Sequence, residues 1–76
     1  MIRQKPRLII AFPSTTQAIE MERKCRAAEL PGRLIPLPRE ISAGCGMAWM
    51  AEPDQEKDLR ALIGREAIKT EGIYIL

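Results

Sequence analysis

The feature that most constrains the fold is the order in which two kinds of apolar pattern follow one another along the 76 residues. Short apolar runs rich in strand-forming residues lie at residues 8–12, 34–37, 47–51 and 72–76. Amphipathic stretches typical of helices lie between the first two runs and between the last two. This order predicts an α+β fold, the ferredoxin-like split βαβ sandwich (βαββαβ), with two helices on one face of a four-stranded antiparallel sheet.

Capping signals predict where the two helices begin and end. Ser14 and Gln17 have the spacing of a capping box, and the apolar stripe that follows extends toward Leu30. Cys25 lies on this stripe and is expected in the core, because free cysteine packs as a small hydrophobic residue. For the second helix, Asp54 is the expected N-cap and Gly64 the expected end.

Two prolines predict which strand lies at the edge of the sheet. Pro36 and Pro38 lack the amide hydrogen that an interior strand donates, so residues 34–37 belong at an edge. The ferredoxin-like topology independently places the second and fourth strands at the edges and the first and third in the centre. The open edge of residues 72–76 would allow a homodimer by strand pairing.

Composition indicates a single soluble domain over residues 1–76. Hydrophobic residues make up 46% and charged residues 29% of the chain, and no apolar run approaches the roughly 20 residues that span a bilayer. The run at 8–12 is too short for a signal peptide core, which predicts a cytoplasmic protein without membrane contact. The net charge of +2 argues against nucleic acid as a partner, and the basic cluster Arg3, Lys5 and Arg7 is expected to be a solvated tail.

The absence of histidine excludes several kinds of chemistry within one protomer. Catalysis by Ser–His or Cys–His pairs and metal sites with histidine ligands cannot be built. Cys25 and Cys45 lie 20 residues apart with no neighbouring thiol, so we expect neither a metal site nor a cofactor. Trp49 and Tyr74 are expected to be core or rim residues.

The segment around Cys45 is the strongest candidate for chemistry. Gly44 and Gly46 remove side-chain bulk on both sides of the cysteine, so that a large electrophile such as the persulfide of another protein can approach its sulfur. Arg39 and turned backbone amides can stabilise a thiolate, which is the reactive form of cysteine. The same pattern also fits a structural cysteine in an ordinary loop, and both interpretations stay open at this point.

The run from Pro36 to Met47 resembles the core motif of the selenium/sulfur carrier-like family of small bacterial proteins. Similarity extends to residues 12–14, 18–22 and 72–74, so it covers nearly the whole chain. The resemblance implies that Cys45 accepts a sulfur or selenium atom as a persulfide or perselenide, in a loop framed by Pro38, Arg39, Ser42, Gly44 and Gly46. It implies a donor such as a cysteine desulfurase, an acceptor protein, and a non-enzymatic carrier rather than an enzyme.

Two other functions are consistent with the sequence. The first is a non-catalytic ferredoxin-like module that binds a small molecule or a protein, in which the Cys45 loop is a structural or ligand-contacting element. The second is a redox or metal-handling protein that uses Cys45 across a dimer. Fold resemblance alone does not choose among these functions.

Overall fold

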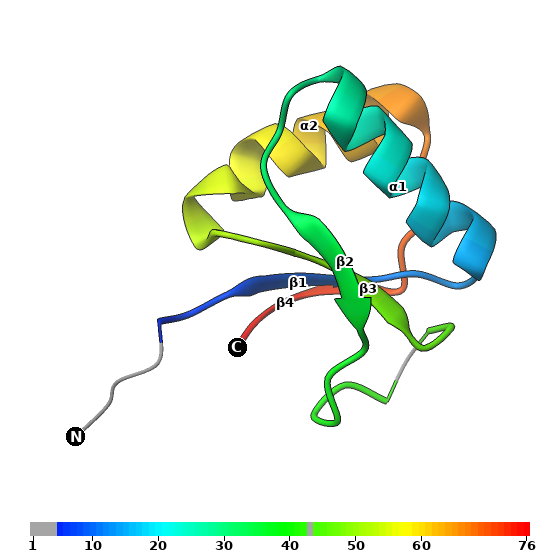
Figure 1. Cartoon of the computed structure of the whole chain (residues 1–76), viewed down its shortest axis with the longest axis vertical. Coiled ribbons are helices and arrows are strands. Elements are labelled where there is room, and N and C mark those ends of the chain that lie inside the picture. The colour runs from blue at the N-terminus through cyan, green and yellow to red at the C-terminus, as the bar shows by residue number, and fades with distance from the viewer. Residues whose placement is uncertain (1–4, 43) are drawn as a thin grey trace.

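The computed structural model of the chain describes residues 5–42 and 44–76, so that Arg3 and Ala43 of the motifs above lie outside the described residues. Its elements follow the predicted order (Figure 1). They are β1 (Leu8–Ala11), α1 (Thr15–Ala27), β2 (Arg33–Pro36), β3 (Met47–Ala51), a 3₁₀ turn (Pro53–Gln55), α2 (Glu56–Glu66) and β4 (Gly72–Ile75). The predicted α+β, ferredoxin-like arrangement is therefore confirmed, and strand boundaries differ from the prediction by one residue at most.

The four strands form one antiparallel sheet in the order β2-β3-β1-β4. The first and third strands are central and the second and fourth are edges, as predicted. Pro36 ends the edge strand β2, where its missing amide hydrogen deprives no interior ladder of a donor. Pro38 lies just beyond the strand.

Both helices cover the same face of the sheet (Figure 1). The main core lies between these layers and is built from the inward-facing side chains of the sheet and the buried stripes of the helices. Its buried members are Leu8, Ile10, Phe12, Ala18, Met21, Cys25, Trp49, Ala51, Leu59, Leu62 and Ile68. A smaller cluster of Ile9, Ala11, Ile41 and Ala48 lies on the opposite face, so every residue of β1 is buried.

The start of α1 confirms half of the predicted capping box. The Ser14 hydroxyl accepts a hydrogen bond from the Gln17 N–H at 3.3 Å. The Gln17 side chain does not return the bond to Ser14. Its oxygen accepts the Lys69 N–H at 3.0 Å and so fastens α1 to the segment that leads into β4. A long-range hydrogen bond to Lys69 thus takes the place of the local bond to Ser14. The local sequence pattern does not encode this long-range bond.

The predicted limits of α2 are wrong. Asp54 lies in the 3₁₀ turn, and α2 begins after Gln55, which makes no side-chain capping bond. Gly64 lies inside the helix, which continues to Glu66 and ends at Ala67 with a φ of 55°. The Ile68 N–H then bonds to the Ile63 carbonyl at 3.0 Å, and Ile68 is buried, so packing of the apolar residue after the turn sets the end of the helix.

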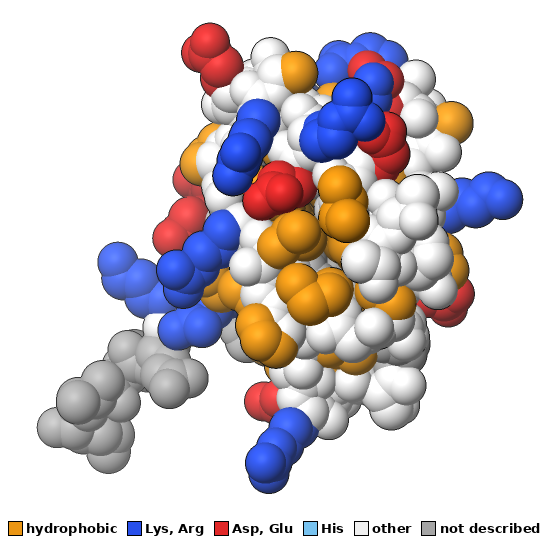
Figure 2. Space-filling view, turned by 45° about the vertical axis from the view of Figure 1, so that its right-hand side comes forward, with side chains coloured by type: hydrophobic (Ala, Val, Ile, Leu, Met, Phe, Trp, Pro, Cys, Tyr) orange, Lys and Arg blue, Asp and Glu red, His pale blue; other side chains and the backbone are white. Residues whose placement is uncertain are grey.

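The outer surfaces of the helices carry charges of both signs. Arg23 pairs with Glu20, Arg26 with Glu22, and Arg60 with Glu56, each along one helix. Figure 2 shows Lys and Arg interspersed with Asp and Glu over the upper part of one face, with hydrophobic side chains at its centre. Within the described residues, no helix is long and apolar enough to cross a membrane.

Candidate functional site

The candidate site is the loop of residues 37–46, which connects β2 to β3 and projects from the end of the sheet (Figure 1). Two backbone hydrogen bonds fasten its second half. The Cys45 N–H donates to the Phe12 carbonyl at 2.9 Å, just beyond β1, and the Leu37 N–H donates to the Gly46 carbonyl at 2.9 Å. The cysteine backbone is thus attached to the end of a central strand, next to the segment that starts α1.

The two glycines that flank Cys45 share an unusual backbone conformation. Gly44 and Gly46 both have a φ of 92°, a region that residues with a side chain rarely adopt. At Gly44 a Cβ atom would lie 2.6 Å from the Phe12 carbonyl oxygen, so glycine also permits the close approach of the loop to β1. At Gly46 a Cβ atom would meet nothing within 4 Å. One glycine lets the loop pack, and the other leaves open space beside the cysteine.

The first half of the loop is held by a turn and an apolar anchor. The Ile41 N–H donates to the Pro38 carbonyl at 3.0 Å, and the Ile41 side chain is buried in the cluster on the face opposite the helices. Arg39 is exposed within this turn. The anchoring contacts of Ile41 and Phe12 were not predicted, although a lone isoleucine in a polar loop is a usable signal of burial.

The structure brings only some of the predicted site residues together. Cys45 is half-buried and packs at the margin of the main core, with Gly44 and Gly46 exposed on either side. Ser42 and Arg39 are exposed farther along the loop. Among residues 5–42 and 44–76, neither makes a side-chain hydrogen bond or ion pair, so their roles at the site stay predictions.

The second thiol lies in a different environment. Cys25 is fully buried on α1, and this burial raises the pKa of its thiol from 9.0 to about 11. The full burial of Cys25 in the main core confirms its predicted position. The two cysteines are both free. In the part of the chain that the structure describes, no group of three or more cysteine and acidic residues could hold a metal ion.

Comparison with known proteins identifies one family. The model of a family described as "putative Se/S carrier protein-like" matches residues 7–75, which is nearly the whole chain and includes the complete Cys45 loop. No curated protein and no solved structure matches the chain.

Proposed function

Because the chain belongs to the putative Se/S carrier protein-like family, we propose that it holds a sulfur or selenium atom on Cys45 and passes it to an acceptor protein. One observation carries the assignment of the atom to this residue. Cys45 is the half-exposed thiol of the pair, and it lies between two glycines with positive φ in a loop bonded to the end of β1. Cys25, with no exposed surface and a raised pKa, cannot serve without unfolding of the core.

The proposed transfer needs no oxidant or reductant. The Cys45 thiolate attacks the terminal sulfur of a donor persulfide, R–S–S–H. A bond forms between the Cys45 Sγ and that sulfur, the S–S bond of the donor persulfide breaks, and the donor leaves as the thiolate R–S⁻ with the electron pair of that bond. Cys45 then carries a persulfide. In the second step a nucleophile of the acceptor attacks the outer sulfur and releases the Cys45 thiolate, and selenium follows the same course as a perselenide.

The loop geometry supports this role in two ways. The backbone bond from Cys45 to Phe12 restrains the position of the Sγ, so each partner meets the thiol in the same place. The empty space beside Gly46 leaves room for an outer sulfur atom and for the partner that delivers it. A donor persulfide on a large protein requires such an open approach.

Arg39 and Ser42 are proposed to contact the partner rather than the sulfur. Both are exposed on the same loop as Cys45. A guanidinium and a hydroxyl in this position can bind a carboxylate or a backbone carbonyl on a docked donor or acceptor. The proposal further comprises a stoichiometric, non-enzymatic carrier that forms one domain and works in the cytoplasm, where thiols stay reduced.

Loading by a cysteine desulfurase tests the proposal. The enzyme and free cysteine are incubated with the reduced protein, the enzyme is removed, and the intact mass of the protein is measured without reductant. We expect the mass to rise by one sulfur atom, and we expect a reductant to reverse the gain. Peptide mapping should place the added atom on Cys45.

Two variants make the assignment specific. Cys45→Ser should lose loading completely, and Cys25→Ala, which keeps a small apolar side chain in the core, should load as the parent does. Arg39→Gln should slow loading without abolishing it. Loading that persists in Cys45→Ser, or that disappears in Cys25→Ala while the protein stays folded, would refute the proposed site.

A further inference from the structure

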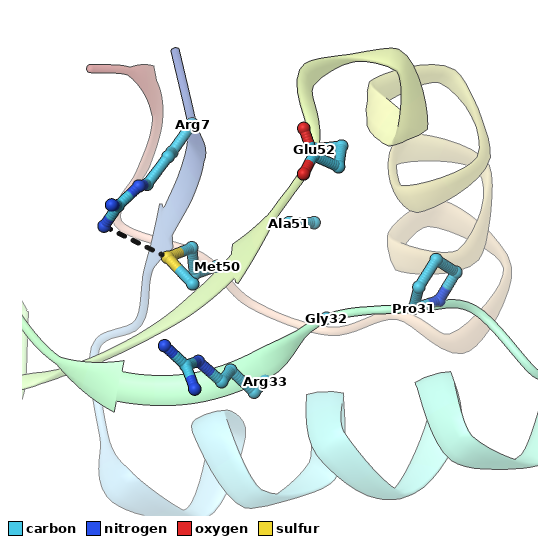
Figure 3. Close-up of a pocket in the computed structure, with 7 residues that line it drawn as sticks. All are labelled: Arg7, Pro31, Gly32, Arg33, Met50, Ala51 and Glu52. Carbon is cyan, nitrogen blue, oxygen red and sulfur yellow. Dashed lines mark hydrogen bonds between the residues drawn. The ribbon is translucent and has the colours of Figure 1, made fainter. Parts of the chain in front are cut away.

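A hollow lies at the other end of β3 from the Cys45 loop. It has a volume of about 330 Å³, near the lower limit of the roughly 300 to 1,000 Å³ typical of small-molecule sites. Figure 3 shows it between the start of β2 and the end of β3. Its lining residues are Arg7, Pro31, Gly32, Arg33, Met50, Ala51 and Glu52. Because Cys45 precedes β3 and this hollow adjoins the end of that strand, the two sites do not overlap.

Two arginines approach the hollow from either side of β3, Arg33 from the start of β2 and Arg7 from the residue before β1. Arg33 of β2 is directly opposite Met50 of β3, and Met50 is directly opposite Ile9 of β1. Alternation along β1 puts Arg7 on the same face of the sheet as Ile9. The Arg7 Nη1 lies 3.7 Å from the Met50 Sδ, and in Figure 3 the two arginine side chains lie on either side of this thioether.

The charges of these two arginines are not matched by carboxylates. In residues 5–42 and 44–76, neither Arg7 nor Arg33 forms an ion pair, whereas Arg23, Arg26 and Arg60 on the helices each pair with a glutamate. The hydrogen bond of Arg7 is to a sulfur atom, which is a weak acceptor. Two guanidinium groups with unused donors therefore border one hollow.

The wall of the hollow depends on a glycine packed against the single tryptophan. Gly32 has a φ of 144°, and a Cβ atom there would lie 2.6 Å from the Trp49 Nε1 and 2.8 Å from the Met50 carbonyl oxygen. The Trp49 indole nitrogen is buried and has no hydrogen-bond partner within the described residues. Trp49 thus lies directly behind the wall and can report on events in the hollow.

We propose that this hollow binds a small organic anion, with its carboxylate or phosphate group between the guanidinium groups of Arg7 and Arg33 and its apolar body against Met50, Ala51 and Pro31. A guanidinium group presents paired N–H donors that match two oxygens of a carboxylate or a phosphate group, and it binds them by charge-assisted hydrogen bonds. Glu52 also borders the hollow and repels a ligand that carries further negative charge. The inference does not rest on the proposed role of Cys45.

Ligands that share one apolar body and differ in the head group test this site. Pentanoate, pentyl phosphate and the neutral 1-pentanol are titrated separately into the reduced protein, and binding is followed by Trp49 fluorescence and by the single indole N–H signal in NMR spectra. We expect saturation by at least one of the two anions with a Kd of about 1 mM or below, and none by the alcohol. The head group that binds more tightly identifies the carboxylate or the phosphate class as the natural ligand.

Charge variants of the lining residues decide whether binding is specific. Arg33→Gln and Arg7→Gln should each weaken binding by about tenfold or more, because each removes charge-assisted hydrogen bonds. Glu52→Gln should strengthen binding several-fold by removing repulsion. Arg60→Gln is the matched control, since it removes the same charge from the exposed surface of α2 and should leave binding unchanged.

Three results would overturn the inference. They are the absence of saturable binding by either anion, saturation by the alcohol as strong as that by the anions, and an equal loss of affinity in the control and in the two arginine variants of the hollow. Binding should be unaffected in Cys45→Ser. The loading assay and the anion titration can therefore fail independently of each other when both are carried out on the same variants.

Discussion

Cys25 in the middle of α1 and Cys45 in the loop of residues 37–46 carry the same chemical group in opposite surroundings. Cys25 has no exposed surface, and its raised pKa keeps it a neutral thiol. Cys45 is half-buried between two glycines with positive φ. The comparison indicates that the position of a cysteine in the fold decides how much of its side chain is exposed to solvent.

The backbone bonds of the two residues show the origin of this difference. The Cys25 carbonyl accepts a hydrogen bond from the Leu30 N–H at 2.8 Å in the turn that follows α1. Cys25 therefore takes part in the C-terminal cap of the helix. The Cys45 N–H bonds to Phe12, which holds the loop against the sheet while the side chain stays at the margin of the core. Each cysteine is fixed in place, but only Cys45 is fixed at the surface.

The largest expected effect is on the rates of alkylation. Iodoacetamide should modify Cys45 about a thousandfold faster than Cys25, because Cys25 requires an opening of the core that costs about 4 kcal/mol or more. The measurement is a time course of peptide mass spectrometry on the native protein at neutral pH. Urea-unfolded protein is the control, in which the two rates should converge. Equal rates in the native protein would erase the distinction between the two thiols.

Of the two serine substitutions, the one at Cys25 should cost more stability, whereas the one at Cys45 should abolish sulfur loading. Cys25→Ser places a hydroxyl in an apolar core and should lower the free energy of unfolding by about 1–3 kcal/mol if the hydroxyl finds no partner. Cys45→Ser should lower it by less than about 1 kcal/mol, since this side chain is only half-buried. Urea denaturation curves of the two variants and the parent give both values. A larger loss in Cys45→Ser than in Cys25→Ser would make Cys45 the structural cysteine.

Alkaline pH should destabilise the fold through Cys25. Unfolded Cys25 loses its proton near pH 9.0, whereas folded Cys25 keeps it to about pH 11, so the unfolded state binds fewer protons in this interval. The stabilisation is complete below pH 9.0 and is lost as the pH rises through about 11, at a cost of about 3 kcal/mol. Unfolding free energies at several pH values measure this decline. The Cys25→Ala variant should lack the part of the decline that comes from ionisation of the thiol. The same decline in both proteins would contradict the assignment.

A pair of glycine substitutions sharpens the account of the loop. Gly46→Ala should cost about 1 kcal/mol, from the positive φ alone, because the added methyl group meets open space. Gly44→Ala carries the same backbone cost and also collides with the Phe12 carbonyl, so it should cost about 1 kcal/mol more and slow sulfur loading. Thermal unfolding and desulfurase loading of the two variants provide the comparison. Equal effects of the two substitutions would show that the approach of the loop to β1 is unimportant.

Much of the fold could be predicted from local patterns in the sequence. The apolar runs predicted the four strands, and Pro36 and Pro38 identified the edge strand. Both signals could be used because each depends only on residues that are close together in the sequence. The ends of the helices were harder to predict. The turn that follows each helix contains a non-glycine residue with positive φ, Glu29 after α1 and Ala67 after α2, and in both cases the next residue is apolar and packs against the main core. Tertiary packing thus overrode the glycine signal at residue 64.

The residues of the candidate site stand out in the sequence, but the contacts that hold them in place do not. Cys45 and its glycines stand together in the sequence, so their pattern indicates a presented thiol without any knowledge of the fold. The bond to Phe12 joins residues 33 positions apart in the chain, and no local pattern encodes it. The hollow with Arg7, Arg33 and Met50 was missed for the same reason, because three segments that lie far apart in the sequence contribute to it.

The most direct test of the central claim is the mass of the protein as its natural host makes it. The protein is isolated without reductant, its intact mass is measured, and the modified peptide is identified by fragmentation. We expect a fraction of molecules with one added sulfur or selenium atom, which a reductant removes and which is located on Cys45. Protein that is unmodified under conditions of active sulfur transfer, or an added atom on Cys25, would contradict it.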